Sequence, residues 1–239
     1  MPARGTGTGP PVWAMEAVMT RETFDGQLQA VLGALADMTA TAGEAIATAT
    51  DALLQADLSA AADVAELDQR LDAARRAVEE RTFEMLARQQ PVATDLRALV
   101  TAIRAAADVD RMGSLAHHVA KVACLRHPAI AVPENLVPIF REMGTVARRM
   151  TESAGAVLVR PDAADAARLD VDDDTMDELH RRLFRHLLGD WIYGVEAAID
   201  VALLGRYYER FADHAVAIAG TVVYLVTGTM PEERGAHLG

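Results

Sequence analysis

Apolar residues recur at three- and four-residue steps along most of this chain, which is the spacing that puts them on one face of an α-helix. The longest such stretch covers residues 24–56 and contains no proline. The pattern predicts a single amphipathic helix of unusual length. Its apolar face is formed by Leu28, Val31, Leu32, Leu35, Met38, Ala42, Ile46, Ala49 and Leu53.

Prolines and glycines divide the rest of the chain into five more helices. Pro91 blocks continuation of the second helix and suits the first position of the third. Pro133 precedes the fourth helix, Gly189 separates the fifth from the sixth, and Pro231 follows the sixth. The six predicted helices cover residues 24–56, 58–89, 91–125, 134–159, 163–188 and 191–227.

Two segments indicate that the chain contains one unit twice. Asp110-Arg-Met-Gly-Ser114 and Glu209-Arg-Phe-Ala-Asp213 share one design at a shift of 99 residues, and each lies in the third helix of its half. The predicted fold class is all-α, with two tandem repeated three-helix bundles built from six long helices. We expect a disordered leader over residues 1–20, bundles over 21–128 and 129–230, and a short tail over 231–239.

Acidic residues recur four positions apart at equivalent places of this repeat, so that each pair shares one helix face. Like charges at that spacing destabilise a helix by about 0.2–0.5 kcal/mol per pair. A cation held jointly by antiparallel neighbouring helices would reverse that cost, and we therefore predict a metal site in each half. The pairs are Asp68 with Asp72, Asp173 with Asp177, and Glu209 with Asp213. At the fourth equivalent position, Asp110 is followed four residues later by Ser114.

A solvated acidic face is the alternative interpretation of any one pair. Asp72 can form an ordinary surface ion pair with Arg76, and Asp177 can do the same with Arg181. Recurrence of the pairs in equivalent places favours the metal site, because independent surface charges would not repeat in this way.

The first half departs from the pattern at Ser114, whose hydroxyl is a weaker ligand for a divalent cation than a carboxylate. His117 lies one turn further along the same face and could supply a nitrogen ligand. Both residues are weaker metal candidates. His214 projects about 100° away from Asp213 and is a poorer one. Gly113 is expected to let neighbouring helices approach closely.

Composition and charge narrow the function classes. The net charge of −12 and the pI near 5.0 argue against nucleic-acid binding and against direct binding to an anionic membrane. The longest apolar run, residues 215–228, is shorter than the roughly 20 residues of a membrane span. The single cysteine, Cys124, cannot form an internal disulfide and is expected to be buried, so we predict a cytoplasmic protein.

Two motifs resemble the PhoU family, the regulators associated with bacterial phosphate-specific transport. Arg88-Gln-Gln-Pro-Val-Ala-Thr-Asp-Leu-Arg97 is similar to the start of that family's third helix, and Tyr208-Glu-Arg-Phe-Ala-Asp-His214 is similar to its sixth-helix signature. The resemblance implies two repeated three-helix bundles, surface metal clusters and no catalytic turnover. By motif, it implies that the ligands are Asp68, Asp72 and Asp110 in one cluster and Asp173, Asp177, Glu209 and Asp213 in the other.

The resemblance also implies partners. Members of the family restrain phosphate uptake and phosphate-starvation signalling, which implies contacts with the ATPase subunit of the phosphate transporter and with a sensor histidine kinase. Any membrane association would then run only through these partners. The residues leave the metal open among iron, zinc, manganese and magnesium, because oxygen sites accept all four. We expect a homodimer, since elongated amphipathic bundles often self-associate.

Two other function classes stay open on the sequence alone. A di-metal carboxylate enzyme of the ferritin-like kind would carry Glu-x-x-His pairs, whereas the nearest match, Glu178-Leu-His180, has a spacing that puts its two side chains on different helix faces. A helical adaptor that binds partners without metal is the other alternative.

Overall fold

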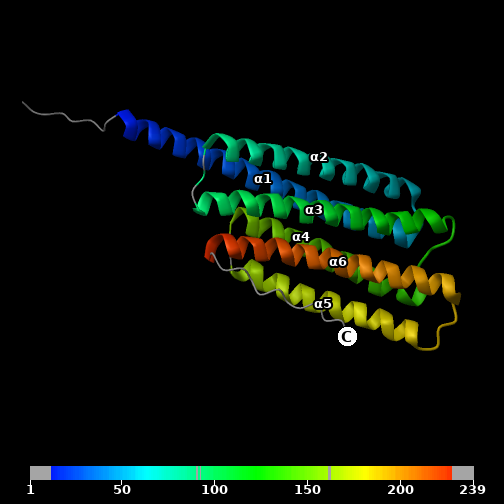
Figure 1. Ribbon diagram of the computed structural model, residues 1–239. Coiled ribbons are helices and arrows are strands. Elements are labelled where there is room, and N and C mark those ends of the chain that lie inside the picture. Colours follow the sequence, from blue (N-terminus) through cyan, green and yellow to red (C-terminus); the bar gives the residue numbers. More distant parts are fainter. Residues whose placement is uncertain (1–11, 90, 92, 161–162, 228–239) are drawn as a thin grey trace, which may run out of the picture.

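The computed structural model describes residues 12–89, 91, 93–160 and 163–227, and within them the chain forms long helices joined by short turns (Figure 1). A single 3₁₀ turn, Glu134–Leu136, precedes α4. The helices are α1 (Val12–Gln55), α2 (Leu58–Gln89), α3 (Ala93–Arg126), α4 (Val137–Val159), α5 (Ala163–Leu188) and α6 (Gly194–Thr227). The predicted all-α fold with two three-helix bundles is confirmed.

The starts of four helices differ from the prediction, and among them α4 begins at Val137, because residues 134–136 form the 3₁₀ turn. Helix α1 begins at Val12 because no glycine or proline interrupts the chain between Pro11 and Phe24, so the predicted leader over residues 1–20 is too long. Helix α3 begins at Ala93, after Pro91. Helix α6 begins at Gly194, whose φ of +85° breaks the helical path after residue 191. Residues 1–11 and the tail over 231–239 lie outside the described residues.

Helices α1, α2 and α3 form one antiparallel bundle, and α4, α5 and α6 form the second. The bundles meet through α1 against α4 and α3 against α6. Helices α2, α3, α6 and α5 make one layer, with α1 and α4 behind it (Figure 1). Within the described residues, the outer helices α2 and α5 therefore pack mainly against the two other helices of their own bundle.

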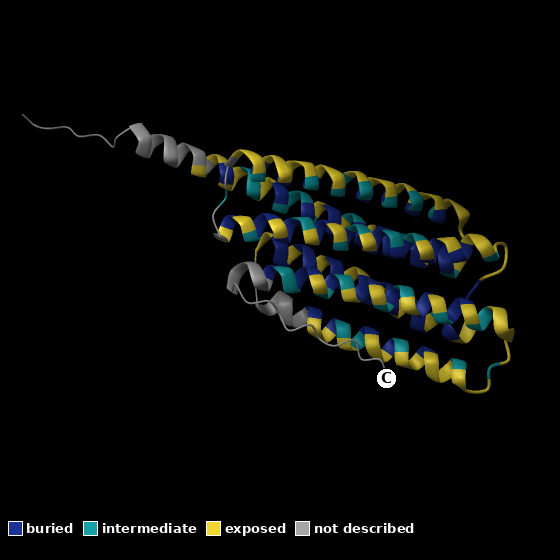
Figure 2. Ribbon diagram, in the orientation of Figure 1, coloured by how far each residue is buried: buried dark blue, intermediate teal, exposed yellow. Residues whose placement is uncertain are grey.

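Burial follows this arrangement (Figure 2). Helices α1 and α4 supply many of the fully buried side chains, and the apolar residues of both halves form one continuous core. Leu35, Ile46, Phe140 and Met143 are completely buried within it. Helices α2 and α5 bury a narrower stripe and leave the rest of their surface to solvent, as amphipathic outer helices do.

Glycines opposite threonines set the spacing between α1 and α4. A methyl group added at any of these glycines would lie 2.4 to 2.5 Å from a threonine hydroxyl oxygen. Each of these hydroxyls donates a hydrogen bond to a carbonyl of its own helix, so it can pack against the glycine without an unsatisfied donor. The pairs are Gly43 with Thr151, Gly144 with Thr50, and Gly155 with Thr39.

One segment of α1, Thr23–Gln55, is long and apolar enough to cross a membrane by length and composition alone. In the fold, 44% of its most apolar window is buried inside the protein, and Val31, Leu35 and Ile46 of this helix are completely buried. The apolar character of α1 is therefore explained by its place in the core, since a buried helix needs apolar residues around much of its circumference.

We predict that Gly144→Ala lowers the free energy of unfolding by about 1–3 kcal/mol, the usual cost of overpacking. The new methyl group would lie 2.5 Å from the Thr50 hydroxyl, which has no room to retreat in the core. Gly26→Ala on α1 is the matched control, because nothing lies within 4 Å of its added methyl group. It should raise stability by about 0.5–1 kcal/mol through helix propensity. Urea denaturation measures both, and equal stability of the two variants would contradict the close-approach account.

Candidate metal sites

The candidate residues of the first half lie on two antiparallel helices of the outer layer. Asp68 and Asp72 come from α2, and Asp110, Ser114 and His117 come from α3. Leu71 on α2 packs against α3 at Gly113, where an added methyl group would lie 2.4 Å from the leucine. The predicted role of Gly113 in close helix approach is confirmed. It keeps the two acidic faces within reach of each other.

Asp68 lies at the centre of one group of contacts. Its carboxylate is 2.8 Å from Nδ1 of His117 and accepts a long hydrogen bond of 3.5 Å from the Ser114 hydroxyl. The structure therefore brings both weaker candidates to the same carboxylate. Ser114 supplies a hydroxyl where the second half has the Asp213 carboxylate, and His117 adds an imidazole nitrogen.

Arg75 occupies the other part of the first site. Its guanidinium donates to Asp72 at 3.0 Å and to Glu79 at 2.8 Å, and lies 3.5 Å from Asp110. Asp72 also pairs with Arg76 at 2.8 Å, as the surface-charge alternative predicted. Asp72 and Asp110 thus share a positive partner that comes from the protein itself.

The second site has the same plan on α5 and α6. Asp173 and Asp177 lie on α5, and Glu209 and Asp213 lie on α6. Arg206, one turn before Glu209, makes a short ion pair with its carboxylate. The anticipated pair of Asp177 with Arg181 does not form, because Arg181 binds Glu178 at 3.1 Å.

The carboxylates of both sites are close enough to disturb each other's ionisation. Burial is the main cause that raises the pKa of Asp110, against which Arg75 acts in the opposite direction. Burial likewise raises the pKa of Glu209 and of Asp213, with repulsion from Asp177 adding to both. The folded protein without a cation therefore disfavours the charged form of these groups.

His180 is a further polar group beside the second site. Its Nε2 is buried and has no hydrogen-bond partner among the described residues. Burial is the main cause that lowers the pKa of the ring, and Arg206 lowers it further. The ring packs against Gly205 on α6 and edge-on against Phe184, 4.9 Å between centroids. His180 corresponds in the repeat to Arg75, so the two halves differ in the group at this position.

The side chains are not preassembled as a closed cage. Within the described residues, no three His, Cys, Asp or Glu side chains already surround a common point in the way a bound ion requires. Arg75 and Arg206 hold part of each carboxylate set, so a cation would have to replace them. Hard cations take oxygen ligands in flexible arrangements, and the side chains involved are at least partly solvent-accessible.

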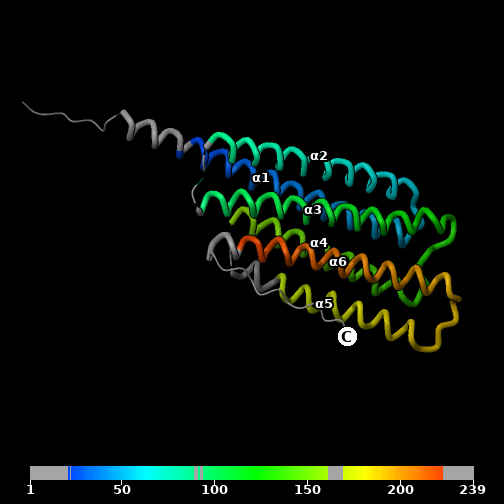
Figure 3. The backbone as a smooth tube through the Cα atoms, viewed as in Figure 1, coloured from blue at the N-terminus to red at the C-terminus, as the bar shows by residue number. Residues whose placement is uncertain are grey.

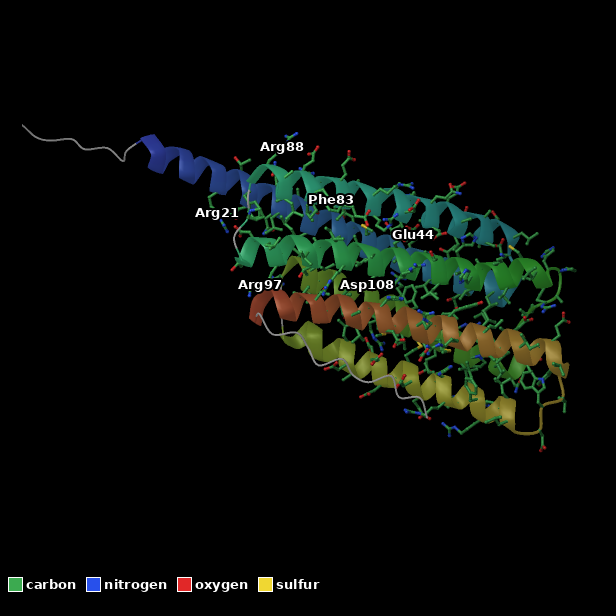
Figure 4. The ribbon with its side chains drawn as sticks, viewed as in Figure 1. Arg21, Glu44, Phe83, Arg88, Arg97 and Asp108 are labelled. Carbon is green, nitrogen blue, oxygen red and sulfur yellow. The ribbon has the colours of Figure 1, made fainter. Side chains whose placement is uncertain are left out.

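Other charged residues act in the packing of the bundles. Asp95, Asp172 and Asp200 are buried, and each binds an arginine from a neighbouring helix. His214 approaches Asp108 on α3 at 3.0 Å, at the junction of the halves, where Figure 4 labels Asp108. The prediction that His214 points away from the site agrees with this contact.

Cys124 and two arginines differ from what the sequence predicted. Cys124 is exposed rather than buried, because it shares the outer face of α3 with Lys121 and Leu125. Arg75 and Arg206 were not foreseen as members of the sites. Arg75 had a signal, since it lies three residues after Asp72 and four before Glu79, and helical neighbours at those spacings meet.

Comparison with known proteins agrees with the repeat. The PhoU domain family matches residues 35–123 and again residues 140–222. Among similar chains, the phosphate-specific transport system accessory protein PhoU homolog 2 of Mycobacterium tuberculosis is 47% identical over 88% of this chain and 100% of its own. PhoU homolog 1 of Mycobacterium leprae is 46% identical over 89% of this chain and 96% of its own.

Solved structures agree as well. The crystal structure of PhoU from Pseudomonas aeruginosa superposes with a TM-score of 0.76 at 29% identity, covering 86% of this chain and all of that one. The phosphate transport system regulatory protein PhoU from Streptococcus pneumoniae has the same fold, with a TM-score of 0.77 at 22% identity over 87% of this chain and 99% of that one. The PhoU domain matches each of the two halves that the repeat defines. This chain belongs to the PhoU domain family.

Proposed function

We propose that this protein is a metal-binding regulatory accessory protein of a phosphate transport system. In this role it restrains phosphate uptake and phosphate-starvation signalling when phosphate is plentiful. It acts in the cytoplasm by contacting the ATPase subunit of the transporter and the sensor histidine kinase of the phosphate response. Support comes from relatives that are named as accessory proteins of phosphate-specific transport.

The observation that carries the metal-binding part is the repeated grouping of partly desolvated carboxylates on two helix pairs. Asp72 and Asp110 in the first half, and Glu209 and Asp213 in the second, are acidic groups that the fold brings together despite their repulsion. A cation with two or three positive charges would offset the desolvation that raises the pKa values of Asp110, Glu209 and Asp213. Divalent or trivalent iron, or zinc, manganese or magnesium, suits such oxygen-rich sites.

The residues have distinct roles in this proposal. Asp68, Asp72 and Asp110 would bind one ion or cluster, with Ser114 and His117 as weaker ligands. Asp173, Asp177, Glu209 and Asp213 would bind the other. The second site is the stronger one because it offers four carboxylates, whereas the first replaces one of them by a hydroxyl.

Arg75 and Arg206 act as internal counter-ions while no metal is bound. Each is near the carboxylates it would leave on metal binding, and a guanidinium is a strong, fixed positive charge. Metal binding would then release a cationic side chain at the surface of each outer helix pair. This exchange changes the charge that a docking partner meets on that face, which gives the ion a way to affect regulation.

We predict that replacing both Glu209 and Asp213 by alanine lowers the metal content of the purified protein while helicity stays unchanged. Neither side chain belongs to the buried apolar core, so their loss removes ligands rather than core packing. The matched control replaces Glu80 and Glu84, an exposed acidic pair at the same spacing on α2. Elemental analysis of protein prepared without chelator gives the stoichiometry, and an equal metal content in both variants would contradict the assignment.

We predict that Arg75→Gln tightens manganese binding at the first site by about tenfold, equivalent to about 1.4 kcal/mol. The substitution removes the charge that competes for Asp72 and Asp110 but keeps a polar side chain. Arg88→Gln, near the end of the same helix, has the same change in net charge and should leave affinity unaltered. Calorimetric titration measures both, and unchanged or weaker binding in Arg75→Gln would exclude the counter-ion role.

The regulatory role has a separate test in cells. Deleting the gene should raise phosphate uptake in phosphate-replete medium, because restraint on the transporter is lost. Reintroducing the natural chain should restore the restraint, and the variant lacking Glu209 and Asp213 should restore it only in part. Radiolabelled phosphate uptake measures this, and uptake that is unchanged by the deletion would contradict the proposed function.

A further inference from the structure

His180 carries a buried nitrogen for which its surroundings provide no hydrogen-bond partner. In the part of the chain that the structure describes, two buried side-chain atoms are in this state, Nε2 of His180 and Nε of Arg97. Nearly all buried polar atoms of folded proteins are hydrogen-bonded, so each exception needs an explanation. The Arg97 nitrogen is a donor without a lone pair and cannot bind a cation, whereas an imidazole nitrogen is a common metal ligand. The nitrogen of His180 is therefore the one that points to a ligand.

The ring of His180 lies between α5 and α6, which run side by side in opposite directions (Figure 3). His180 follows Asp177 by three residues, a spacing that places both side chains on one face of α5. Its counterpart on α6 is Gly205, where an added methyl group would lie 3.6 Å from Nε2. Gly205 precedes Glu209 by four residues, which is about one helical turn. The unpartnered nitrogen thus faces α6 close to the second site.

The charges that act on the ring are those of the second site. Burial is the main cause that lowers the pKa of His180, Arg206 lowers it further, and Asp177 and Asp213 act in the opposite direction. Arg206 is also the side chain that pairs with Glu209. Because the pKa of the ring is held below its ordinary value of about 6.5, the imidazole is neutral at neutral pH and keeps the lone pair that binds a metal.

Packing restricts the ring in this position. Phe184 meets it edge-on, with 4.9 Å between the ring centroids. Gly205 leaves room for the ring, since a methyl group added there would lie 3.2 Å from Cδ2. A ligand whose rotamer is already restricted by its neighbours loses less conformational entropy when it binds an ion.

The first half has a different group at the equivalent position. The shift of 105 residues that superposes Asp68 on Asp173 also superposes Arg75 on His180. The guanidinium of Arg75 is permanently charged and only donates hydrogen bonds, so it competes with a cation for Asp72. His180 instead offers a cation a nitrogen ligand at this position of the repeat.

We propose that His180 is a nitrogen ligand of the second metal site and that it makes this site prefer zinc to magnesium. Carboxylate oxygens alone suit magnesium, whereas imidazole suits zinc and other transition metals. The inference rests on the proposed metal binding by Asp177, Glu209 and Asp213, and it names a ligand and a preference that those carboxylates leave open. A zinc ion that displaced Arg206 from Glu209 would also remove the positive charge beside the ring.

Nitrogen NMR of the natural chain tests the bond itself. In protein labelled with nitrogen-15 at its histidines, zinc should shift the Nε2 resonance of His180, because coordination engages the free lone pair. Magnesium should leave this resonance in place. His180→Gln assigns the resonance by its disappearance. Zinc that binds the second site without moving the resonance would overturn the proposal.

Affinity supplies a second test, in a chain whose first site is disabled by Asp68→Asn and Asp110→Asn. There His180→Gln should weaken zinc binding by about tenfold or more, since loss of even an indirect metal partner costs about 10–100-fold. Magnesium affinity should stay the same. His186→Gln, which changes an exposed histidine of the same helix, is the matched control and should keep both affinities. Zinc affinity that is equal in the two variants would contradict the assignment.

These outcomes separate the nitrogen ligand from the metal site as a whole. Zinc binding that requires Glu209 and Asp213 but not His180 would exclude the ligand and leave the proposed metal site intact. A natural chain that binds neither zinc nor magnesium would overturn both. Circular dichroism of each variant distinguishes a lost ligand from a lost fold.

Discussion

The close approach of α1 and α4 is the constraint on which the rest of this structure depends. Gly43, Gly144 and Gly155 let threonines of the facing helix lie where larger residues would hold the two helices apart. With these helices in contact, both bundles share one apolar core rather than two small ones. A shared core buries a larger fraction of the chain than two separate cores would. A single three-helix bundle of about half this length would leave more of its surface exposed to water.

This packing determines which helix faces can carry groups of carboxylates. Since α1 and α4 fill the interior, the helix pairs α2–α3 and α5–α6 are left with faces that meet both a neighbour and solvent. Carboxylates in that position are partly desolvated, which raises the pKa of Asp110, Glu209 and Asp213, yet they stay accessible to ions. The arginines beside them offset part of this cost when no other cation is present.

Most of the fold could be predicted from the sequence because its signals are local. Helical periodicity, proline positions and the repeat of Asp110 in Glu209 all depend on short stretches of chain. The start of α1 was missed because the glycines and prolines of residues 1–11 favour a leader, which the prediction extends to residue 20, although nothing between Pro11 and Phe24 stops a helix. The exposure of Cys124 was missed because a helical stripe alone does not reveal which helix covers it.

The candidate sites were harder to predict than the fold. Spacing correctly assigned the acidic residues to facing helices, but which cation partners reach them depends on side-chain packing between helices. Arg206 binds Glu209 on its own helix, whereas Arg75 on α2 bridges to Asp110 on α3, and only the second contact requires tertiary structure. His180 beside Gly205 is likewise a product of close packing between α5 and α6.

In our proposal, the two acidic helix pairs hold metal ions jointly. Anomalous scattering from crystals of manganese-loaded protein tests it most directly, because the signal locates the ions themselves. The account predicts peaks between α2 and α3 beside Asp72 and Asp110, and between α5 and α6 beside Glu209 and Asp213, with the stronger peak in the second half. Manganese peaks that avoid both helix pairs, or an absence of any peak there in fully loaded crystals, would contradict it.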